Sequence, residues 1–69
     1  MYISEMYRKI HEISFERAVE ILEEEFDLED YEIESIRREG QIEMNAYDWE
    51  GDYAYIWYHP EERTLNIEY

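Results

Sequence analysis

The chain has 69 residues, of which twenty are Asp or Glu and six are Lys or Arg, so its formal net charge is −14 at pH 7. Such a charge is repelled by nucleic acid and by anionic lipid headgroups, which argues against direct binding to DNA, RNA or a membrane surface. The chain contains no Cys, which excludes disulfides and thiolate metal sites. No apolar run approaches the ~18 residues of a membrane span, and no signal-peptide core is evident. We therefore expect a cytoplasmic protein.

High negative charge is also typical of disordered tails, but such tails contain few aromatic residues. This chain has eight Tyr, two Trp and two Phe, distributed among the carboxylates. A folded chain of this length buries only about 60% of its unfolded surface, so its core is thin. The sequence predicts one folded acidic domain over residues 1–69.

The first part of the chain has the apolar spacing of helices. Ser4 is a candidate N-cap for a first helix, and Ser14 is the candidate N-cap for a second. The apolar positions of the first are Ile3, Met6, Tyr7, Ile10 and Ile13; those of the second are Phe15, Ala18, Val19, Leu22 and Phe26. The two stripes are out of phase, which favours two helices, or one kinked near Ser14, over residues 3–27.

From Tyr31 onward the apolar period changes to two, the period of strands. Alternation is clear in residues 42–47, 53–58 and 64–69, and weaker in 31–38, where Ile33 and Ile36 have opposite parity. Short turns between these segments favour antiparallel neighbours. The predicted fold class is α+β: one or two N-terminal helices packed on a four-stranded antiparallel β-meander at residues 31–69, in the order α-α-β-β-β-β.

The turn between the second and third predicted strands decides which side chains share a face. A three-residue loop at 49–51 with Gly51 in the left-handed conformation pairs Tyr47 with Tyr53, but it also sets Asp48 beside Asp52, a like-charge pair. A two-residue loop would instead place a Glu at positive φ, which is disfavoured. We favour the three-residue loop.

With that register the sheet has two unlike faces. One face carries the aliphatic residues that suit the second helix: Ile42, Met44, Ala46, Ala54, Ile56, Tyr58, Leu65 and Ile67. The other carries five large aromatic residues: Tyr47, Trp49, Tyr53, Tyr55 and Trp57. An exposed aromatic patch with carboxylates around it suits a partner rich in Arg and Lys, since the rings offer cation–π surface. The alternatives are that the first helix or a second copy of the chain covers this face.

The carboxylates are concentrated in two places. One group lies in residues 23–34: Glu23, Glu24, Glu25, Asp27, Glu29, Asp30, Glu32 and Glu34. The other is the predicted turn with Asp48, Glu50 and Asp52. A solvated helix face and polar loops explain any single charge, but the total exceeds the net charge of about 2 to 8 that keeps a small domain soluble. A rigid display of carboxylates can imitate a nucleic-acid backbone, which carries about one charge per 1.7 Å of duplex axis. Adaptation to high salt is an alternative explanation, and the likeness of residues 48–52 to a calcium loop is weak.

The sequence offers little support for catalysis. Ser4, Ser14, Ser35 and Thr64 are the hydroxyl candidates outside Tyr, and two of them are expected caps. No His accompanies them in a nucleophile pattern, and there is no Gly-rich phosphate loop. We expect a protein that is not an enzyme and that needs neither a cofactor nor a metal.

In size, charge and its pattern of helix plus antiparallel sheet, the chain resembles small acidic inhibitors of phages and mobile elements, such as DNA-mimic antirestriction proteins, uracil-DNA glycosylase inhibitors and anti-CRISPR proteins. The resemblance assigns no residue roles. It implies an inhibitor, acting in the host cytoplasm if phage-encoded, that blocks the basic nucleic-acid channel of a defence or repair complex. An antitoxin-like partner of one basic protein would use the same mechanism.

We expect the partner-binding residues to be the acids Glu23, Glu24, Asp27, Glu29, Asp30, Glu32, Glu34, Asp48, Glu50 and Asp52 and the aromatic residues Tyr47, Trp49, Tyr53, Tyr55 and Trp57. The acids would steer and pair with Arg and Lys, and the rings would anchor the centre. The alternative function is a structural domain that forms a homodimer through its aromatic face.

Overall fold

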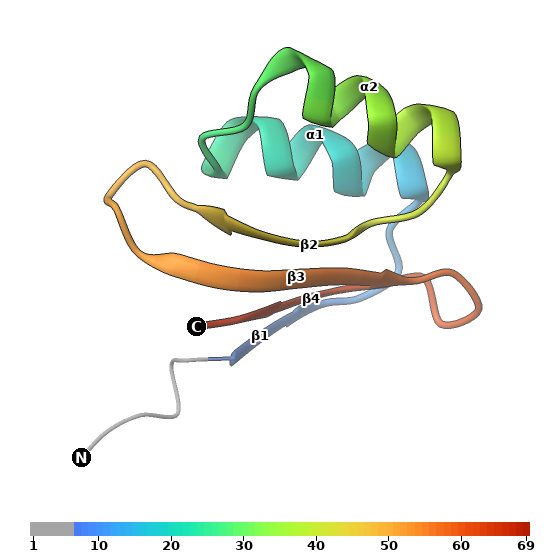
Figure 1. Cartoon of the computed structure of the whole chain (residues 1–69). Helices are drawn as coiled ribbons and strands as arrows, with labels where there is room; N and C mark the ends of the chain where they lie inside the picture. The colour runs from blue at the N-terminus through green and yellow to red at the C-terminus, as the bar shows by residue number, and fades with distance from the viewer. Residues whose placement is uncertain (1–6) are drawn as a thin grey trace.

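Two helices lie on one face of a four-stranded antiparallel sheet (Figure 1). This computed structural model describes residues 7–69. Its elements are β1 (Tyr7–Ile10), α1 (Phe15–Glu25), α2 (Asp30–Glu39), β2 (Glu43–Tyr47), β3 (Tyr53–His59) and β4 (Thr64–Glu68). The strand order is β1-β4-β3-β2. The predicted α+β class, with helices packed on a four-stranded antiparallel sheet, is confirmed.

Residues 31–38, predicted as a weak strand, form most of α2 instead. The opposite parity of Ile33 and Ile36 is the three-residue spacing of a helix face, and both side chains are buried. Glu29 and Glu32 form a capping box at the start of α2, and Gly40 ends it with φ 71°. A capping box before an apolar helical spacing and Gly after it are start and stop signals of a helix. These local signals therefore favour the helix that forms, although residues 31–38 were predicted as a strand.

Residues 7–10, predicted as part of a helix over 3–13, form strand β1; residues 3–6 of that prediction, including Ser4, lie outside the described residues. β1 pairs antiparallel with β4, with Arg8 opposite Ile67 and Ile10 opposite Leu65. Its hydrogen bonds complete the β4 ladder, and pairing of this kind overrides a local helical preference. Only β2, β3 and β4 follow one another as a meander, because β1 joins the far edge of β4 from the start of the chain.

Helix α1 forms where the sequence predicts it. The Ser14 hydroxyl oxygen accepts a hydrogen bond from the Arg17 backbone N–H at 3.1 Å, which is an N-cap interaction. The apolar stripe of α1 faces the sheet, and Leu22 and Val19 are fully buried against it. Phe26, directly after the helix, is 1% exposed and enters the same core.

The predicted register of the β2–β3 hairpin is confirmed. Tyr47 lies opposite Tyr53, and Met44 lies opposite Ile56. The Asp48 N–H donates to the Asp52 carbonyl oxygen at 2.9 Å, and Gly51 has φ 93°. The loop therefore has three residues, and its left-handed position is occupied by Gly as expected.

The core lies between the helices and the sheet face that carries the aliphatic residues. Its sheet side consists of Ile42, Ala46, Ala54, Ile56, Leu65 and Ile67, all buried. Tyr58 closes one end of this layer, since its hydroxyl donates to the Ile13 carbonyl oxygen at 2.7 Å and its ring meets Phe15 edge-on. Within residues 7–69, neither helix has the length and apolar run needed to cross a membrane.

Leu22 provides a test of this core. We predict that Leu22→Ala lowers the free energy of unfolding by about 2–5 kcal/mol, because it removes a fully buried side chain and leaves a cavity. Small domains have a total stability of only roughly 5 kcal/mol or somewhat more, so the variant should be largely unfolded in moderate urea. Urea titration followed by circular dichroism measures the loss. The control Glu34→Ala on the exposed side of α2 should change stability by no more than about 0.5 kcal/mol.

Candidate protein-binding surfaces

The sheet face opposite the helices, here called the open face, is not covered by any other element of residues 7–69 (Figure 1). At one end of this face the rings of Tyr47 and Tyr53 lie 4.7 Å apart, and these side chains are 56% and 55% exposed. In the middle the Tyr55 and Trp57 rings lie 5.1 Å apart and are half-buried. Four of the five predicted aromatic residues therefore share one face, and the alternative that a helix covers this face does not occur among the described residues.

Strand β1 adds residues to the open face that sequence reasoning missed. The Tyr7 ring stacks on Trp57 at 6.1 Å, and the Tyr7 hydroxyl donates to the Asn66 side-chain oxygen at 3.0 Å. Lys9 lies on the same face, with its ammonium 5.8 Å from the centre of the Tyr7 ring. Because residues 7–10 were predicted as helix, nothing placed them beside β4. A four-residue strand shows too little alternation to reveal itself.

Hydrogen bonds hold the middle of the open face rigid. The Tyr55 hydroxyl donates to the Glu43 carboxylate at 2.7 Å, and this bond raises the pKa of Tyr55. Asn66 is only 5% exposed, and its amide lies within reach of the Trp57 and Thr64 carbonyl oxygens. The centre is thus a preformed platform, while the Tyr47–Tyr53 pair projects further into solvent.

Trp49 does not belong to the open face, contrary to the prediction. It lies in the β2–β3 loop, and its indole N–H donates to the Glu24 carbonyl oxygen at the end of α1, at 3.1 Å. This contact turns the ring toward the helix layer while 63% of the residue stays exposed. An unpaired carbonyl at the C-terminus of a helix is a ready acceptor, which explains the position.

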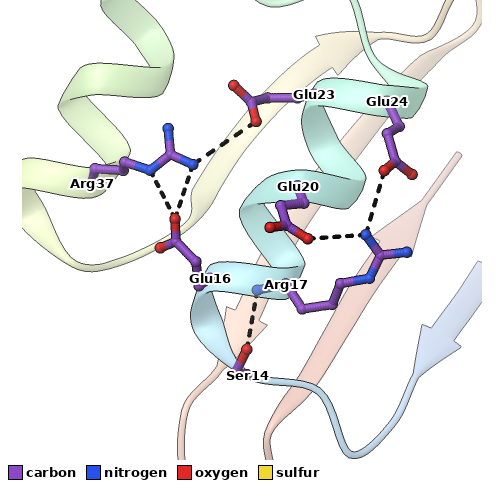
Figure 2. Close-up of polar contacts among 7 residues, drawn as sticks. All are labelled: Ser14, Glu16, Arg17, Glu20, Glu23, Glu24 and Arg37. Carbon is purple, nitrogen blue, oxygen red and sulfur yellow. Dashed lines mark hydrogen bonds and ion pairs between the residues drawn. The ribbon is translucent and has the colours of Figure 1, made fainter.

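Part of the predicted acidic group of residues 23–34 is neutralised within the chain (Figure 2). Arg17 pairs with Glu20 at 3.1 Å and with Glu24 at 3.4 Å along α1. Arg37 reaches from α2 to Glu16 at 3.0 Å and to Glu23 at 3.8 Å, so it links the two helices. Arg8 of β1 pairs with Glu25 at 2.8 Å, which raises the pKa of the Arg8 guanidinium. Glu23 and Glu24 therefore contribute less to the outward field than their number suggests.

Other acids of the group at residues 23–34 stabilise the start of α2. The Glu29 backbone N–H donates to the Glu32 carboxylate at 2.9 Å within the capping box. Asp30 and Glu32 stand in the first turn, where negative charge interacts favourably with the helix dipole. These carboxylates remain negative toward solvent, but replacing Glu29 or Glu32 would also weaken the helix.

Six carboxylates without a cationic partner lie at one end of the molecule. The α1–α2 linker bonds to β2, since the Asp27 N–H donates to the Tyr47 carbonyl oxygen at 2.9 Å. This brings the linker beside the β2–β3 turn, at the left in Figure 1. We call this region the acidic end; it comprises Asp27, Glu29, Asp30, Asp48, Glu50 and Asp52. Within residues 7–69, none of these six forms an ion pair with Lys, Arg or His.

The tip of the acidic end is ordered by Asp48. One of its carboxylate oxygens accepts from the backbone N–H groups of Glu50 and Asp52, each at 2.9 Å, and the other accepts from the Tyr69 hydroxyl at 3.0 Å. Hydrogen bonding to the Asp52 backbone holds the pKa of Asp48 below its usual value. Burial, together with the bond to Asp48, raises the pKa of Tyr69 to about 12. The carboxylate oxygens of Asp48, Glu50 and Asp52 lie within 4.8 Å of one another. Because Asp48 already accepts three bonds, its evident role is to shape the turn.

Within residues 7–69, the Ser and Thr hydroxyls are engaged in structural bonds. Ser14 caps α1. The Ser35 hydroxyl donates to the Glu39 carboxylate at 3.4 Å. Thr64 is 2% exposed; its hydroxyl donates to the Glu62 carbonyl oxygen at 3.0 Å and lies 3.4 Å from a His11 ring nitrogen. Burial and the carbonyl bond make this pair a poor nucleophile and base. That the protein is not an enzyme stays a prediction.

Asp48 makes the stability of the turn dependent on pH. Because its pKa is lower in the folded state than in the unfolded chain, its contribution is present above the unfolded value near pH 4 and is lost as the pH falls through the folded value. We predict that Asp48→Ala lowers the melting temperature at neutral pH and that its difference from the wild type shrinks in acid. Thermal unfolding measured as a function of pH tests this. The control Glu50→Ala, which keeps the backbone N–H bonds, should show a smaller difference at neutral pH.

Comparison with known proteins gives no family for this chain. No family model matches its sequence, no curated protein matches it, and no solved structure matches its fold.

Proposed function

We propose that the protein is a small acidic inhibitor that binds a basic nucleic-acid-binding protein or complex and blocks its DNA or RNA site. The observation that carries the proposal is the acidic end. Arg8, Arg17 and Arg37 are held in pairs with acids of α1, and six carboxylates that have no ion pair within residues 7–69 lie together on the α1–α2 linker, the start of α2 and the β2–β3 turn. A fixed cluster of negative charge of this kind attracts the Arg and Lys side chains of a nucleic-acid channel.

The exposed tyrosines of the open face adjoin this charge. Tyr47 and Tyr53 directly precede and follow the segment 48–52, and both are more than half exposed. An Arg that reaches the turn would meet carboxylates on one side and aromatic rings on the other, which combines ion pairing with cation–π contact. We assign Tyr47 and Tyr53 as anchors and the acidic end as the source of electrostatic steering. Tyr55 and Trp57 would extend the contact along the sheet.

A structural homodimer is the second candidate, and the uncovered aromatic face favours it. Two copies meeting through this face would each carry a charge of −14, so mutual repulsion opposes the contact. Sedimentation at micromolar concentration separates the two functions. A monomer with quencher-accessible Trp supports the inhibitor, and a tight dimer with protected Trp supports the structural domain.

The blocking function is tested with the immobilised domain. A nuclease-treated lysate is applied at low salt, and bound proteins are eluted with a salt gradient. Each captured protein is then purified and mixed with a labelled DNA or RNA that it binds. We expect the domain to displace that ligand stoichiometrically from at least one captured protein. If every captured protein keeps its nucleic acid at saturating domain, the blocking mechanism is wrong.

We predict that reversing charge at the acidic end slows association with that partner. The triple variant Asp27→Lys, Glu50→Lys, Asp52→Lys leaves Asp48 and the capping box intact. Its association rate should fall about tenfold or more at low salt and become less sensitive to salt, because steering is electrostatic. Stopped-flow mixing at several salt concentrations measures both.

The matched control carries the same charge change at the opposite end of the molecule. Glu12, Glu61 and Glu62 lie in the β1–α1 and β3–β4 connections, which are joined by the bond from the Ile13 N–H to the Arg63 carbonyl oxygen at 3.1 Å. Replacing these three by Lys should affect the association rate much less. Equal effects of the two triple variants would mean that only net charge matters and that the acidic end is not the site.

The anchoring role has a separate test. We predict that Tyr53→Ala speeds dissociation of the complex about tenfold, whereas Tyr53→Phe changes it little, because the ring and not the hydroxyl makes the contact. Tyr53 is largely exposed, so neither change should unfold the domain. Surface plasmon resonance gives the dissociation rates. An unchanged dissociation rate for Tyr53→Ala would show that Tyr53 does not anchor the partner.

A further inference from the structure

Strand β2 is an edge strand whose outer side is partly free. The strand order places β2 at the end of the sheet, with β3 as its neighbour on the inner side. At its C-terminal end the outer side is already occupied, because the chain forms a bridge between Phe26 and Asp48. The outer side of Glu43–Asn45 is not occupied in this way. This stretch is a short free edge beside α2 (Figure 1).

The register shows which backbone groups point outward. The Tyr58 N–H donates to the Ile42 carbonyl oxygen at 3.0 Å, and the Asp48 N–H donates to the Asp52 carbonyl oxygen at 2.9 Å. Bonding alternates along an antiparallel strand. The backbone N–H and C=O groups of even-numbered residues of β2 therefore point toward β3, and those of odd-numbered residues point outward. The Asp27 N–H confirms this phase, since it donates to the carbonyl oxygen of Tyr47.

The outward groups of Glu43 and Asn45 are therefore available. Within residues 7–69, no group donates to their carbonyl oxygens or accepts from their N–H groups. A row of unpaired N–H and C=O groups on an edge strand is a template for another extended segment.

A groove lies between α2 and the start of this edge. It has a volume of about 220 Å³ between α2 and β2 and is lined, among others, by Ile36 and Met44 and by the exposed Tyr31. Glu32 and Glu39 of α2 also line it, and no Lys or Arg does; Glu43 is a further lining residue, but its carboxylate accepts from Tyr55 on the open face. The groove thus combines apolar side chains and the carboxylates of α2 with the unpaired backbone groups of Glu43.

We propose that the free edge of β2 and the groove beside α2 bind an extended basic segment of a partner protein, which adds to the sheet as a fifth strand. Its backbone pairs with Glu43 and Asn45. On the α2 side its apolar side chains contact Ile36 and Met44, and its Lys or Arg side chains meet Glu32 and Glu39. A second copy of this chain suits the groove poorly, because its own β2 and α2 would bring further carboxylates. This surface lies apart from the acidic end and the Tyr47–Tyr53 pair, so the proposal stands or falls separately from the proposed function.

The test uses the full chain and a defined probe, a fluorescein-labelled peptide of about seven residues in which pairs of Lys alternate with pairs of Val, so that each face of the extended peptide carries both. Two further versions carry backbone N-methyl groups on one or the other set of alternate residues. We expect one version to lose affinity about tenfold or more and the other to bind almost as well as the parent, because only one set of N–H groups faces β2. Equal affinity of all three peptides would show that charge attraction alone explains the binding, and would overturn the proposal.

Amide hydrogen exchange locates the site. On addition of the parent peptide, the Glu43 and Asn45 amides should become protected, while those of Met44 and Ala46 are protected already by β3. Binding without new protection at Glu43 and Asn45 would place the peptide elsewhere. Protection of both amides in the free domain, with a dimer in sedimentation, would show that a second copy occupies the edge, and would also overturn the proposal.

Two substitutions in α2 provide matched charge changes. Glu39 lines the groove and Glu34 does not, and both are exposed residues of α2. We predict that Glu39→Lys weakens the probe about tenfold by fluorescence anisotropy and that Glu34→Lys has a much smaller effect. A Lys in the last turn of α2 is compatible with the helix dipole, so loss of folding should not obscure the result. Equal effects of the two substitutions would contradict a site in the groove.

Discussion

Two short helices can cover only one face of a four-stranded sheet, and the rest of the molecule follows from this constraint. Leu22 and Val19 of α1 and Ile33 and Ile36 of α2 complete a core against the aliphatic face. The opposite face meets no apolar layer within residues 7–69. It carries amphipathic Tyr and Trp side chains, and the hydroxyls of Tyr7 and Tyr55 bond to side chains of the sheet. A large uncovered aromatic surface is therefore a product of the architecture as much as a sign of function, and its rigidity makes it usable for binding.

The ion pairs are also concentrated in one part of the molecule. Arg8, Arg17 and Arg37 all serve α1, where they neutralise its exposed acids and link it to β1 and α2. Exposed pairs of this kind contribute little each, about 0–1 kcal/mol, but their placement decides where the field of the protein is strong. The helix layer is partly compensated and the acidic end is not. Net charge alone conveys none of this polarity.

Sequence reasoning recovered the parts of the fold that local chemistry determines. The Ser14 cap, the stripe of α1 and the β2–β3 register with Gly51 in the loop agree with the structure. The prediction was wrong where a segment is short or fits two periods. Residues 7–10 were predicted as helix and form a strand, and residues 31–38 were predicted as a strand and form most of a helix. The candidate site shows the same division. The alternation of residues 53–57 placed Tyr53, Tyr55 and Trp57 together, but the turning of Trp49 onto α1, and the meeting of Asp27 with the β2–β3 turn, depend on contacts between distant segments.

The acidic end has a thermodynamic consequence for the free protein. Six carboxylates held close together repel one another, so the isolated domain stores unfavourable electrostatic energy in its folded state. A basic partner acts on these groups as a multivalent counterion and releases that energy when it binds. Folding and binding are then linked: the complex should gain more stability than the contacts alone supply, and the gain should be largest in dilute buffer. Mobile salt relieves the same repulsion, so it would stabilise the free domain while it weakens the complex.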